Sequence, residues 1–440
     1  MAIDLKFLII LVFALLLRIA AFYIPHDGWD QIYYTSLAMK LDTLKLSDYN
    51  LRDVSIKELS GAGGREIYKS SKSPNDLLHE QKRYGLYMYD EPLFCQPPGL
   101  SFLIKISHDL LAQGKGYVYS THRAFYYAKK RHFPYFFSEE IYKSIIPLTF
   151  SLLTICLVYW FSVTYINLPT AYFATLFLAV NPVDIMSASK VWTDTMASFF
   201  FALTLILFYM AYKKNNVFIM LLSALACAAA IWTRTPSLFL IPIVFFIKLY
   251  YFELSPRKSI WELVDIKIIL FLLAVFTLTL PWFELNVRLF GSPMHIANQK
   301  NLGDLFPFVY YVMHRPWYTY PVNIFCQNPL WVLCFFIPFF PIDRQIRFLL
   351  CVWSITPILI LSLLPRFAFV SIEDRYALPS YPAICLAAGY VLSQIHHRYN
   401  QVRWVGIVLN ILTGLSILLS VIIAVYYVYY KMVDCIPFPC

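Results

Sequence analysis

The sequence predicts an all-α polytopic membrane protein with about eleven transmembrane helices and a large first external loop that carries short surface helices. The first observation is composition: of 440 residues, 59% are hydrophobic and only 14% are charged. Globular chains contain about 25% charged residues, so this chain has too few charges for a water-exposed surface. The second observation is that apolar runs follow one another closely after residue 142, with basic residues clustered between them.

The first apolar run is Phe7–Ile24, which follows Lys6. A secretory signal peptide is the alternative to a retained anchor helix at this position. Arg18 interrupts the apolar stretch, and no A-x-A cleavage motif precedes His26. We therefore expect a helix that stays in the membrane.

A long polar stretch, Pro25–Tyr142, follows and is rich in Asp, Lys, Ser, Gly and Tyr. It contains one weakly apolar segment, Gly99–Leu111. That segment is too short to span a bilayer, which needs about 20 apolar residues. We expect it to form a short amphipathic helix lying in the membrane surface.

The remaining apolar runs predict the other spans. They are Ser144–Tyr165, Thr170–Met186, Trp192–Tyr212, Val217–Trp232, Ser237–Phe252, Ile266–Leu285, Pro329–Phe340, Phe348–Leu364, Leu378–Ile395 and Val405–Tyr430. Several are shorter than about 18 residues, so two runs can also belong to one broken helix. We predict one transmembrane domain over residues 1–430 and an external tail at 431–440, with no internal repeat.

The distribution of basic residues predicts the orientation of the spans. With the N-terminus inside, the inside loops hold Lys213, Lys214, Arg257, Lys258, Arg344, Arg347, Arg398 and Arg403. Because Lys and Arg favour the cytoplasmic side, this orientation is preferred. It puts the loops 25–142 and 286–328 and the C-terminal tail outside. A bacterial chain would then have a periplasmic or extracellular site in the plasma membrane, and a eukaryotic chain a luminal site in the endoplasmic reticulum.

The net charge of +10 comes from 36 Lys and Arg against 26 Asp and Glu. Basic clusters between apolar runs are typical of residues that contact anionic lipid headgroups, and a nucleic-acid groove is not expected. We expect membrane lipids as partners and no nucleic acid. The sequence contains no P-loop motif, so ATP-driven transport by this chain alone is not expected.

An acidic segment comes directly after the first helix. Asp27 and Asp30 would both lie at the outer membrane surface. From Asp30 onward, Tyr34, Ala38 and Leu41 recur at helical spacing. The structural alternative is that Asp30 is a helix N-cap and Asp27 belongs to a turn.

His26, Asp27 and Asp30 together offer nitrogen and oxygen ligands within five residues. A divalent ion held there is the alternative to a metal-free site. We expect no metal and no other cofactor.

Six short segments occur in one order along the chain, on or next to the predicted outer face. They are Asp30–Leu41, Gln96–Leu100, Ser189–Asp194, Trp232–Arg234, His314–Tyr318 and Arg375–Pro379. This ordered set resembles the GT-C glycosyltransferases, the superfamily of the protein O-mannosyltransferases and the lipid A aminoarabinose transferase. The chain departs from the pattern at Gln31, where many members carry a second acid, and residues 42–89 match nothing in it.

The resemblance implies the GT-C fold and a sugar donor linked to a polyprenyl phosphate. The lipid phosphate leaves as a stable anion, so its site needs positive charge. Arg375, Arg234 and Lys190 are the candidate phosphate-binding residues, because all three lie at predicted outer helix ends. The structural alternative for each is a long cationic side chain that snorkels to the interface.

The resemblance also implies a base for the acceptor hydroxyl in a single displacement that inverts the anomeric carbon. Asp30 is the first candidate and Asp27 the second. Asp194 either orients Lys190 or the acceptor, or is a plain N-cap of the next helix. The supporting candidates are Asp194, Tyr34, Pro97, Pro98 and His314. The acceptor is a protein, lipid A or another glycolipid or glycan.

Two other functions fit a polytopic chain with basic outer segments. A transporter or flippase of lipid-linked sugars needs ionisable groups near the middle of the bilayer, and Arg18 is the main such residue in the predicted spans. An O-antigen ligase or polymerase would depend on Arg and His of the external loop. The carboxylates at the outer edge favour the glycosyltransferase.

Overall fold

The computed structural model describes residues 4–22, 34–35, 37–38, 41, 97–112, 141–251, 265–290, 293, 316, 318–363, 374–399 and 402–430. Within these ranges the chain is helical and contains no β-strand. The predicted all-α architecture is therefore confirmed for the part of the chain that the structure describes.

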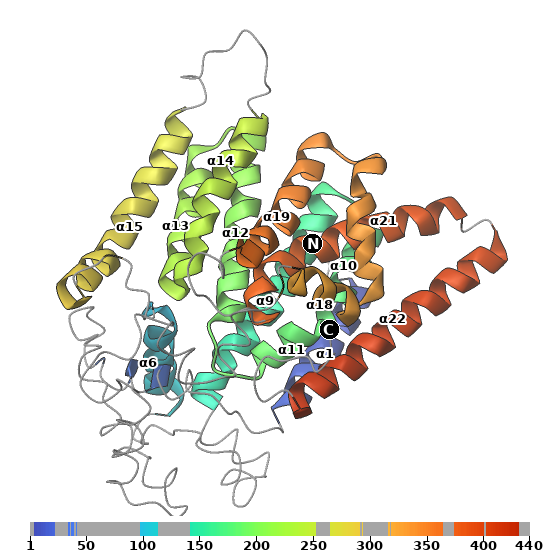
Figure 1. The fold of residues 1–440 in the computed structure, drawn as a ribbon, viewed down its shortest axis with the longest axis horizontal. Coiled ribbons are helices and arrows are strands. Elements are labelled where there is room, and N and C mark those ends of the chain that lie inside the picture. The colour runs from blue at the N-terminus through green and yellow to red at the C-terminus, as the bar shows by residue number, and fades with distance from the viewer. Residues whose placement is uncertain are drawn as a thin grey trace, which may run out of the picture.

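The helices of the first half begin with α1, which spans Leu5–Ala21. The others are α6 (Gly99–Leu111), α9 (Ile141–Tyr165), α10 (Leu168–Ala179), α11 (Pro182–Ala188), α12 (Asp194–Lys213), α13 (Val217–Thr233), the 3-10 helix η5 (Thr235–Phe239) and α14 (Leu240–Tyr251). The segment Gly99–Leu111 forms the helix predicted for it. It packs against α9 and α13, and Figure 1 shows it near the lower end of α13.

The second half contains α15, which spans Ile266–Phe290 and so continues past the predicted span. The others are α18 (Thr319–Gln327), the 3-10 helix η7 (Pro329–Phe339), α19 (Arg344–Leu363), the 3-10 helix η8 (Asp374–Ser380), α21 (Tyr381–Tyr399) and α22 (Arg403–Tyr430). The predicted external loop at 286–328 is thus helical at both of its ends.

Five of the described helices are long and apolar enough to cross a membrane, and up to seven spans result if each of two bent helix pairs counts as one. The predicted number of about eleven is not confirmed. Part of the difference comes from α13 and the run Thr235–Leu249, which are apolar but shorter.

The predicted single span Thr170–Met186 is broken. Helix α10 ends at Ala179, α11 begins at Pro182, and their axes differ by 59°. Proline has no N–H and its ring clashes with the preceding turn, so a helix cannot continue straight through it. Asn181 caps the new helix, because its Oδ1 accepts hydrogen bonds from the N–H groups of Val183 and Asp184.

A second break separates α18 from η7, with a bend of 108°. Asn328 and Pro329 produce it in the same way, because Asn328 Oδ1 accepts a hydrogen bond from Leu330 N and the proline opens the next turn. The predicted span Pro329–Phe340 is therefore a 3-10 helix that follows a sharp turn.

Opposite charges gather at one end of the bundle, where α12 finishes. Lys213 Nζ lies 3.3 Å from Asp343 Oδ2, and Lys248 Nζ lies 2.5 Å from Asp265 Oδ2. Burial raises the pKa of the Asp343 carboxyl, but hydrogen bonds from backbone N–H groups and the nearby Lys213 outweigh it and hold that pKa below its ordinary value. Because α12 runs from Asp194 to Lys213, Asp194 lies at the opposite end.

A close helix crossing holds α10 against α21. A Cβ built on Gly389 of α21 would lie 2.8 Å from the backbone nitrogen of Ala174 in α10. Small residues at such crossings let two backbones approach, which is how membrane helices gain packing.

We expect Gly389→Ala to lower the thermal stability of the purified protein, because overpacking a close contact costs about 1–3 kcal/mol. The matched control is Gly414→Ala in α22, where an added Cβ has no atom within 4 Å. There alanine favours the helix by about 1 kcal/mol, so the control should melt at the same temperature or higher. Equal melting of Gly389→Ala and wild type would contradict the crossing.

Candidate functional site

Three separate stretches of chain meet at the end of the bundle where α12 begins. The turn after α11 carries Lys190 and Trp192 and leads directly into Asp194, the first residue of α12. Helix α13 ends at Thr233, so that Arg234 stands in an extended conformation at its end. The 3-10 helix η8 carries Arg375 and Tyr376. Each of these residues therefore lies where a helix begins or ends.

Asp194 lies between two arginines. Its Oδ1 forms an ion pair with Nη1 of Arg234, and its Oδ2 lies 3.9 Å from Nη1 of Arg375. The Asp194 side chain is 2% exposed, while those of Arg234 and Arg375 are 16% and 12% exposed. The carboxylate is thus buried beneath guanidinium groups that still reach the surface of the described residues.

Two aromatic rings separate the cations. Trp192 lies close to both Lys190 and Arg375, with its ring centroid 4.3 Å from Lys190 Nζ and 4.2 Å from Arg375 Cζ. The Tyr376 ring centroid lies 4.0 Å from Arg234 Cζ and 5.4 Å from Arg375 Cζ. Aromatic faces attract cations, so the rings fix the three positive groups close together in spite of their repulsion.

This arrangement, which we call the cation site, consists of Lys190, Arg234, Arg375 and Asp194. It brings together the three predicted phosphate-binding residues and one supporting residue from positions 190 to 375. Three positive groups and one carboxylate leave an excess of positive charge. Planar guanidinium forks and an ammonium are the groups that proteins use to hold phosphate oxygens.

One sequence-based expectation for Asp194 is wrong. The N-cap of α12 is Thr193, so Asp194 is not the plain cap that its position before an apolar run indicated. Its ion-pair partners are Arg234 and Arg375, which the sequence did not indicate, and a role in orienting Lys190 or the acceptor stays a prediction. The Lys190 ammonium lies over the Trp192 ring.

A buried network of hydrogen bonds connects η8 to three neighbouring helices. Asp374 accepts hydrogen bonds from Asn323 Nδ2 and from the Tyr427 hydroxyl, each at 2.7 Å. Gln327 extends the network, because it donates to Tyr427 OH at 3.0 Å and accepts from Tyr381 OH at 2.6 Å. The network ties η8 to α18, α21 and α22, and so fixes the element that carries Arg375.

Sequence reasoning did not identify this network. Asn323, Gln327 and Tyr427 are polar side chains on segments that are otherwise apolar, which is the one signal that was available. Buried polar groups of this kind are normally hydrogen-bonded to one another.

The supporting residue Tyr34 lies in a second apolar cluster. This cluster includes Tyr34, Leu37, Ala38, Leu41, Leu100, Ile104, Val191 and Trp282. Residues 34–35 and 37–38 are helical, as the spacing predicts, whereas Leu41 is not helical. Val191 stands between Lys190 and Trp192, so the segment after Asp30 shares one apolar cluster with the turn that carries Lys190.

Pro97 and Pro98 lead into α6, and Pro98 is its N-cap residue. A Cβ at Gly99 would lie only 2.7 Å from the carbonyl oxygen of Trp232. The Pro-Pro-Gly segment therefore touches the end of α13 two residues before Arg234. Four predicted site residues, namely His26, Asp27, Asp30 and His314, lie outside the described residues.

The described part of the chain holds no group of three His, Cys, Asp or Glu side chains arranged to bind a metal ion. The cation site itself offers two guanidinium forks and an ammonium, which are suited to binding an anionic group.

Several solved structures share this fold. ArnT from Cupriavidus metallidurans bound to undecaprenyl phosphate is 13% identical, with a TM-score of 0.54 over 97% of this chain and 75% of that chain. The archaeal oligosaccharyltransferase AglB from Archaeoglobus fulgidus, in complex with an inhibitory peptide and a dolichol-phosphate, is 10% identical with a TM-score of 0.55. That match covers 96% of this chain and 56% of AglB, so this chain spans little more than half of AglB.

No protein-family model and no curated protein sequence matches the chain. The likeness to ArnT and AglB, both members of the GT-C superfamily, shows that the chain has the GT-C fold. Together with its apolar helices, this makes it a multi-pass integral membrane protein.

Proposed function

We propose that this chain, which has the GT-C fold, is a glycosyltransferase that moves a sugar from a polyprenyl-phosphate donor to an acceptor at the outer face of the membrane. The observation that carries the proposal is the convergence of Lys190, Arg234 and Arg375 at one end of the bundle. Undecaprenyl phosphate in ArnT and dolichol-phosphate in AglB are ligands of the same chemical class.

In the proposed reaction, the acceptor oxygen attacks the anomeric carbon while the bond from that carbon to the phosphate oxygen breaks. The bonding electrons leave with the lipid phosphate, whose negative charge rises as it departs. Lys190, Arg234 and Arg375 would stabilise that charge as it develops, which is the kind of interaction that lowers a barrier. Asp30 would accept the proton of the acceptor, and the configuration of the sugar would invert.

The outer location is supported by the basic residues at the opposite end of the bundle. Lys213 and Lys214 lie at the end of α12, and Arg344 and Arg347 lie in the first turn of α19, next to the Asp343 that pairs with Lys213. If the positive-inside rule holds for this chain, that end faces the cytoplasm and the cation site faces outward. The acceptor is a protein, lipid A or another glycolipid or glycan, as the sequence predicts.

The test is an assay of purified wild-type protein with a panel of radiolabelled polyprenyl-phosphate sugars and candidate acceptors. We expect one donor to be consumed, with free lipid phosphate formed in a one-to-one ratio to transferred sugar, and the product anomer to be inverted by NMR. Among the described residues, the buried ion pair between Arg18 and Asp184 is a feature that favours a flippase. Donor that crosses liposome membranes without any transfer would establish that alternative.

A further inference from the structure

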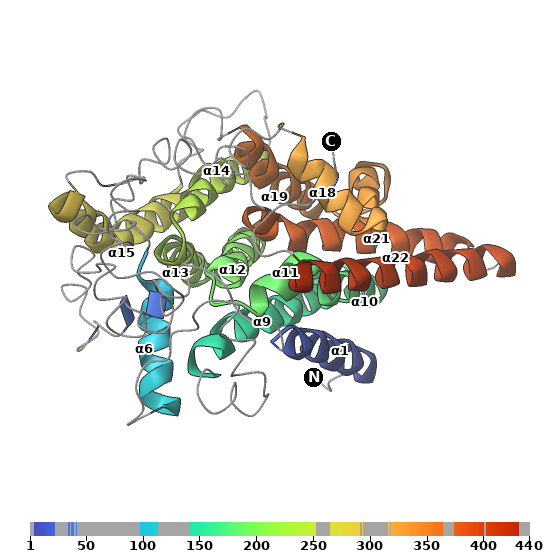
Figure 2. The same ribbon diagram turned by 60° about the horizontal axis from the view of Figure 1, so that its bottom comes forward.

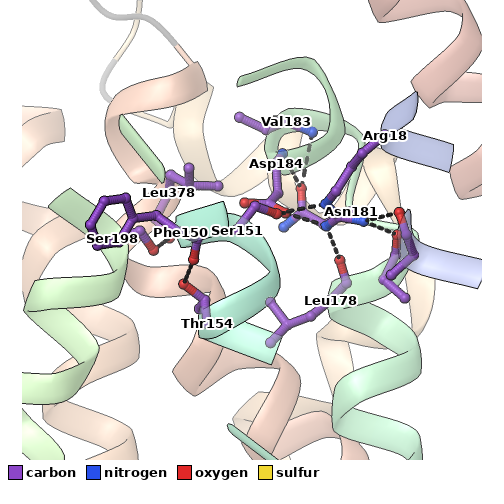
Figure 3. Close-up of polar contacts among 12 residues, drawn as sticks. Arg18, Phe150, Ser151, Thr154, Leu178, Asn181, Val183, Asp184, Ser198 and Leu378 are labelled. Atoms are coloured by element: carbon purple, nitrogen blue, oxygen red, sulfur yellow. Dashed lines mark hydrogen bonds and ion pairs between the residues drawn. The ribbon is translucent and has the colours of Figure 1, made fainter. Parts of the chain in front are cut away.

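Arg18 is fully buried in the bundle and does not reach the surface. Its side chain is 0% exposed and forms an ion pair with Oδ2 of Asp184 in α11. Its Nε donates to Ser151 Oγ of α9 at 2.6 Å, and Ser151 in turn donates to Asp184 Oδ2. Figure 3 shows the three side chains pointing toward one another from α1, α9 and α11. Snorkelling therefore does not explain this arginine.

The same guanidinium fills a gap that the helix break creates. Where α10 stops, its last carbonyls lose the N–H partners that a continuing α-helix would supply, and the Leu178 carbonyl accepts instead from Asn181 N at 3.2 Å. Nη1 of Arg18 donates to the Ala179 carbonyl at 3.1 Å and Nη2 to the Leu178 carbonyl at 3.3 Å. With Nη1 also donating to Ala14 O at 3.0 Å, every N–H of Arg18 has an acceptor.

Arg18 thus contacts both sides of the bend: it donates hydrogen bonds to the end of α10 and pairs with Asp184 in the first turn of α11. A buried ion pair contributes little net stability compared with apolar residues of the same size, because removing two charges from water is costly. The directional hydrogen bonds of this ion pair fix the geometry of the bend, which apolar packing alone cannot do. Helix α11 contacts α1, α9, α12, α22 and η8, and Figure 2 shows it among α9, α12 and α22. A change in its direction would therefore disturb several neighbouring elements.

A chain of contacts leads from the ion pair toward the elements of the cation site. A small cavity with room for about one water molecule borders the ion pair and is lined among others by Ser151, Asp184, Ser198 and Leu378. Ser198 follows Asp194 by one turn of α12 and donates to the Leu378 carbonyl at 3.2 Å. Leu378 follows Arg375 in η8. From α11 the chain needs only two residues to reach Lys190 and six to reach Asp194.

We propose that the Arg18–Asp184 ion pair is a positioning device: it fixes the bend between α10 and α11, and thereby sets Lys190 and Asp194 against Arg234 and Arg375. This inference rests on the proposed phosphate-binding role of the cation site. Arg18 and Asp184 touch no substrate and are positioning residues. Helix α1 precedes Asp30 in the sequence, and α11 precedes Lys190. The ion pair therefore links the helix before the predicted base to the helix before the cation site.

The test compares wild type with the double variant Arg18→Gln/Asp184→Asn. Either single variant leaves one buried group without its charged partner and is strongly destabilising, whereas the double variant keeps amide donors and leaves no unpaired charge. The matched control is Thr170→Val/Ser393→Ala, which removes another fully buried polar contact, 3.1 Å long, between α10 and α21.

Two readouts are taken in detergent: amide hydrogen exchange of residues 182–194, and affinity for undecaprenyl phosphate as the probe. We expect the Arg18/Asp184 double variant to remain folded, to exchange about tenfold faster in that segment, and to bind the probe at least about tenfold more weakly. The Thr170/Ser393 control should change neither. Arg18→Lys, which keeps the charge but lacks the fork, should lie between wild type and the double variant.

Unchanged exchange over 182–194 in the double variant would overturn the inference, and so would faster exchange with unchanged probe affinity. Absence of probe binding by the wild type would count against the proposed function instead. In that case the exchange measurement still decides whether the ion pair holds α11.

Discussion

Replacing Asp30 with asparagine is expected to lower the rate of sugar transfer by at least about 100-fold while leaving donor affinity unchanged. An acceptor hydroxyl is a poor nucleophile until its proton is removed, and a positioned base contributes about 10²–10⁴ in rate. Asparagine has nearly the same shape but cannot accept that proton. The measurement is single-turnover transfer from a labelled donor, alongside a direct binding assay.

The described carboxylates near the cation site are already engaged, which points to a base outside it. Both oxygens of Asp194 face arginines, and both oxygens of Asp374 accept hydrogen bonds. Tyr34, Leu37 and Ala38 belong to the same apolar cluster as Val191, the sequence neighbour of Lys190, and this supports the expectation for Asp30. Asp30 lies four residues before Tyr34.

Asp27→Asn is the matched control, because it removes the same charge three residues away. It should retain most of the activity. If Asp27→Asn is inactive and Asp30→Asn is active, the two roles are exchanged. If both retain near-normal transfer, neither residue is the base.

The sequence was sufficient to predict the fold class and to select three basic residues that the structure brings together. Lys190, Arg234 and Arg375 each stand at the boundary of an apolar run, and run boundaries on the same side of a membrane come together in a bundle. The periodicity of Tyr34, Ala38 and Leu41 correctly predicted that all three side chains are buried in the second cluster, although Leu41 itself is not helical. Both signals are local, which is why they are readable without a structure.

The sequence did not indicate which residues pair with the buried charges. Asp184 lies 166 residues from Arg18, and their contact depends on a 59° bend that hydropathy cannot reveal. The breaks at Asn181-Pro182 and Asn328-Pro329 were visible as residue pairs, but their geometry follows from how the next helix packs. The arginine partners of Asp194 were not predicted for the same reason, because they come from the end of α13 and from η8.

Arg375→Ala is expected to weaken binding of the donor and of undecaprenyl phosphate by about 10- to 100-fold, because hydrogen bonds to a charged group contribute about 1.5–3 kcal/mol. Arg375→Lys should recover part of this loss, since an ammonium keeps the charge but lacks the planar fork and stacks less well on Trp192. The control is Lys214→Ala, an equal change of charge on an exposed residue at the other end of α12.

The comparison of donor with product separates phosphate binding from mere interfacial anchoring. The donor is a phosphodiester with one negative charge, whereas the released lipid phosphate is a monoester that carries about −1.5 to −2 at pH 7. A guanidinium that contacts the phosphate therefore contributes more to product than to donor binding, and Arg375→Ala should weaken product binding more. Titration of both ligands measures this difference. Equal, unchanged affinities would mean that Arg375 only anchors η8 at the membrane surface, and that the phosphate is held elsewhere.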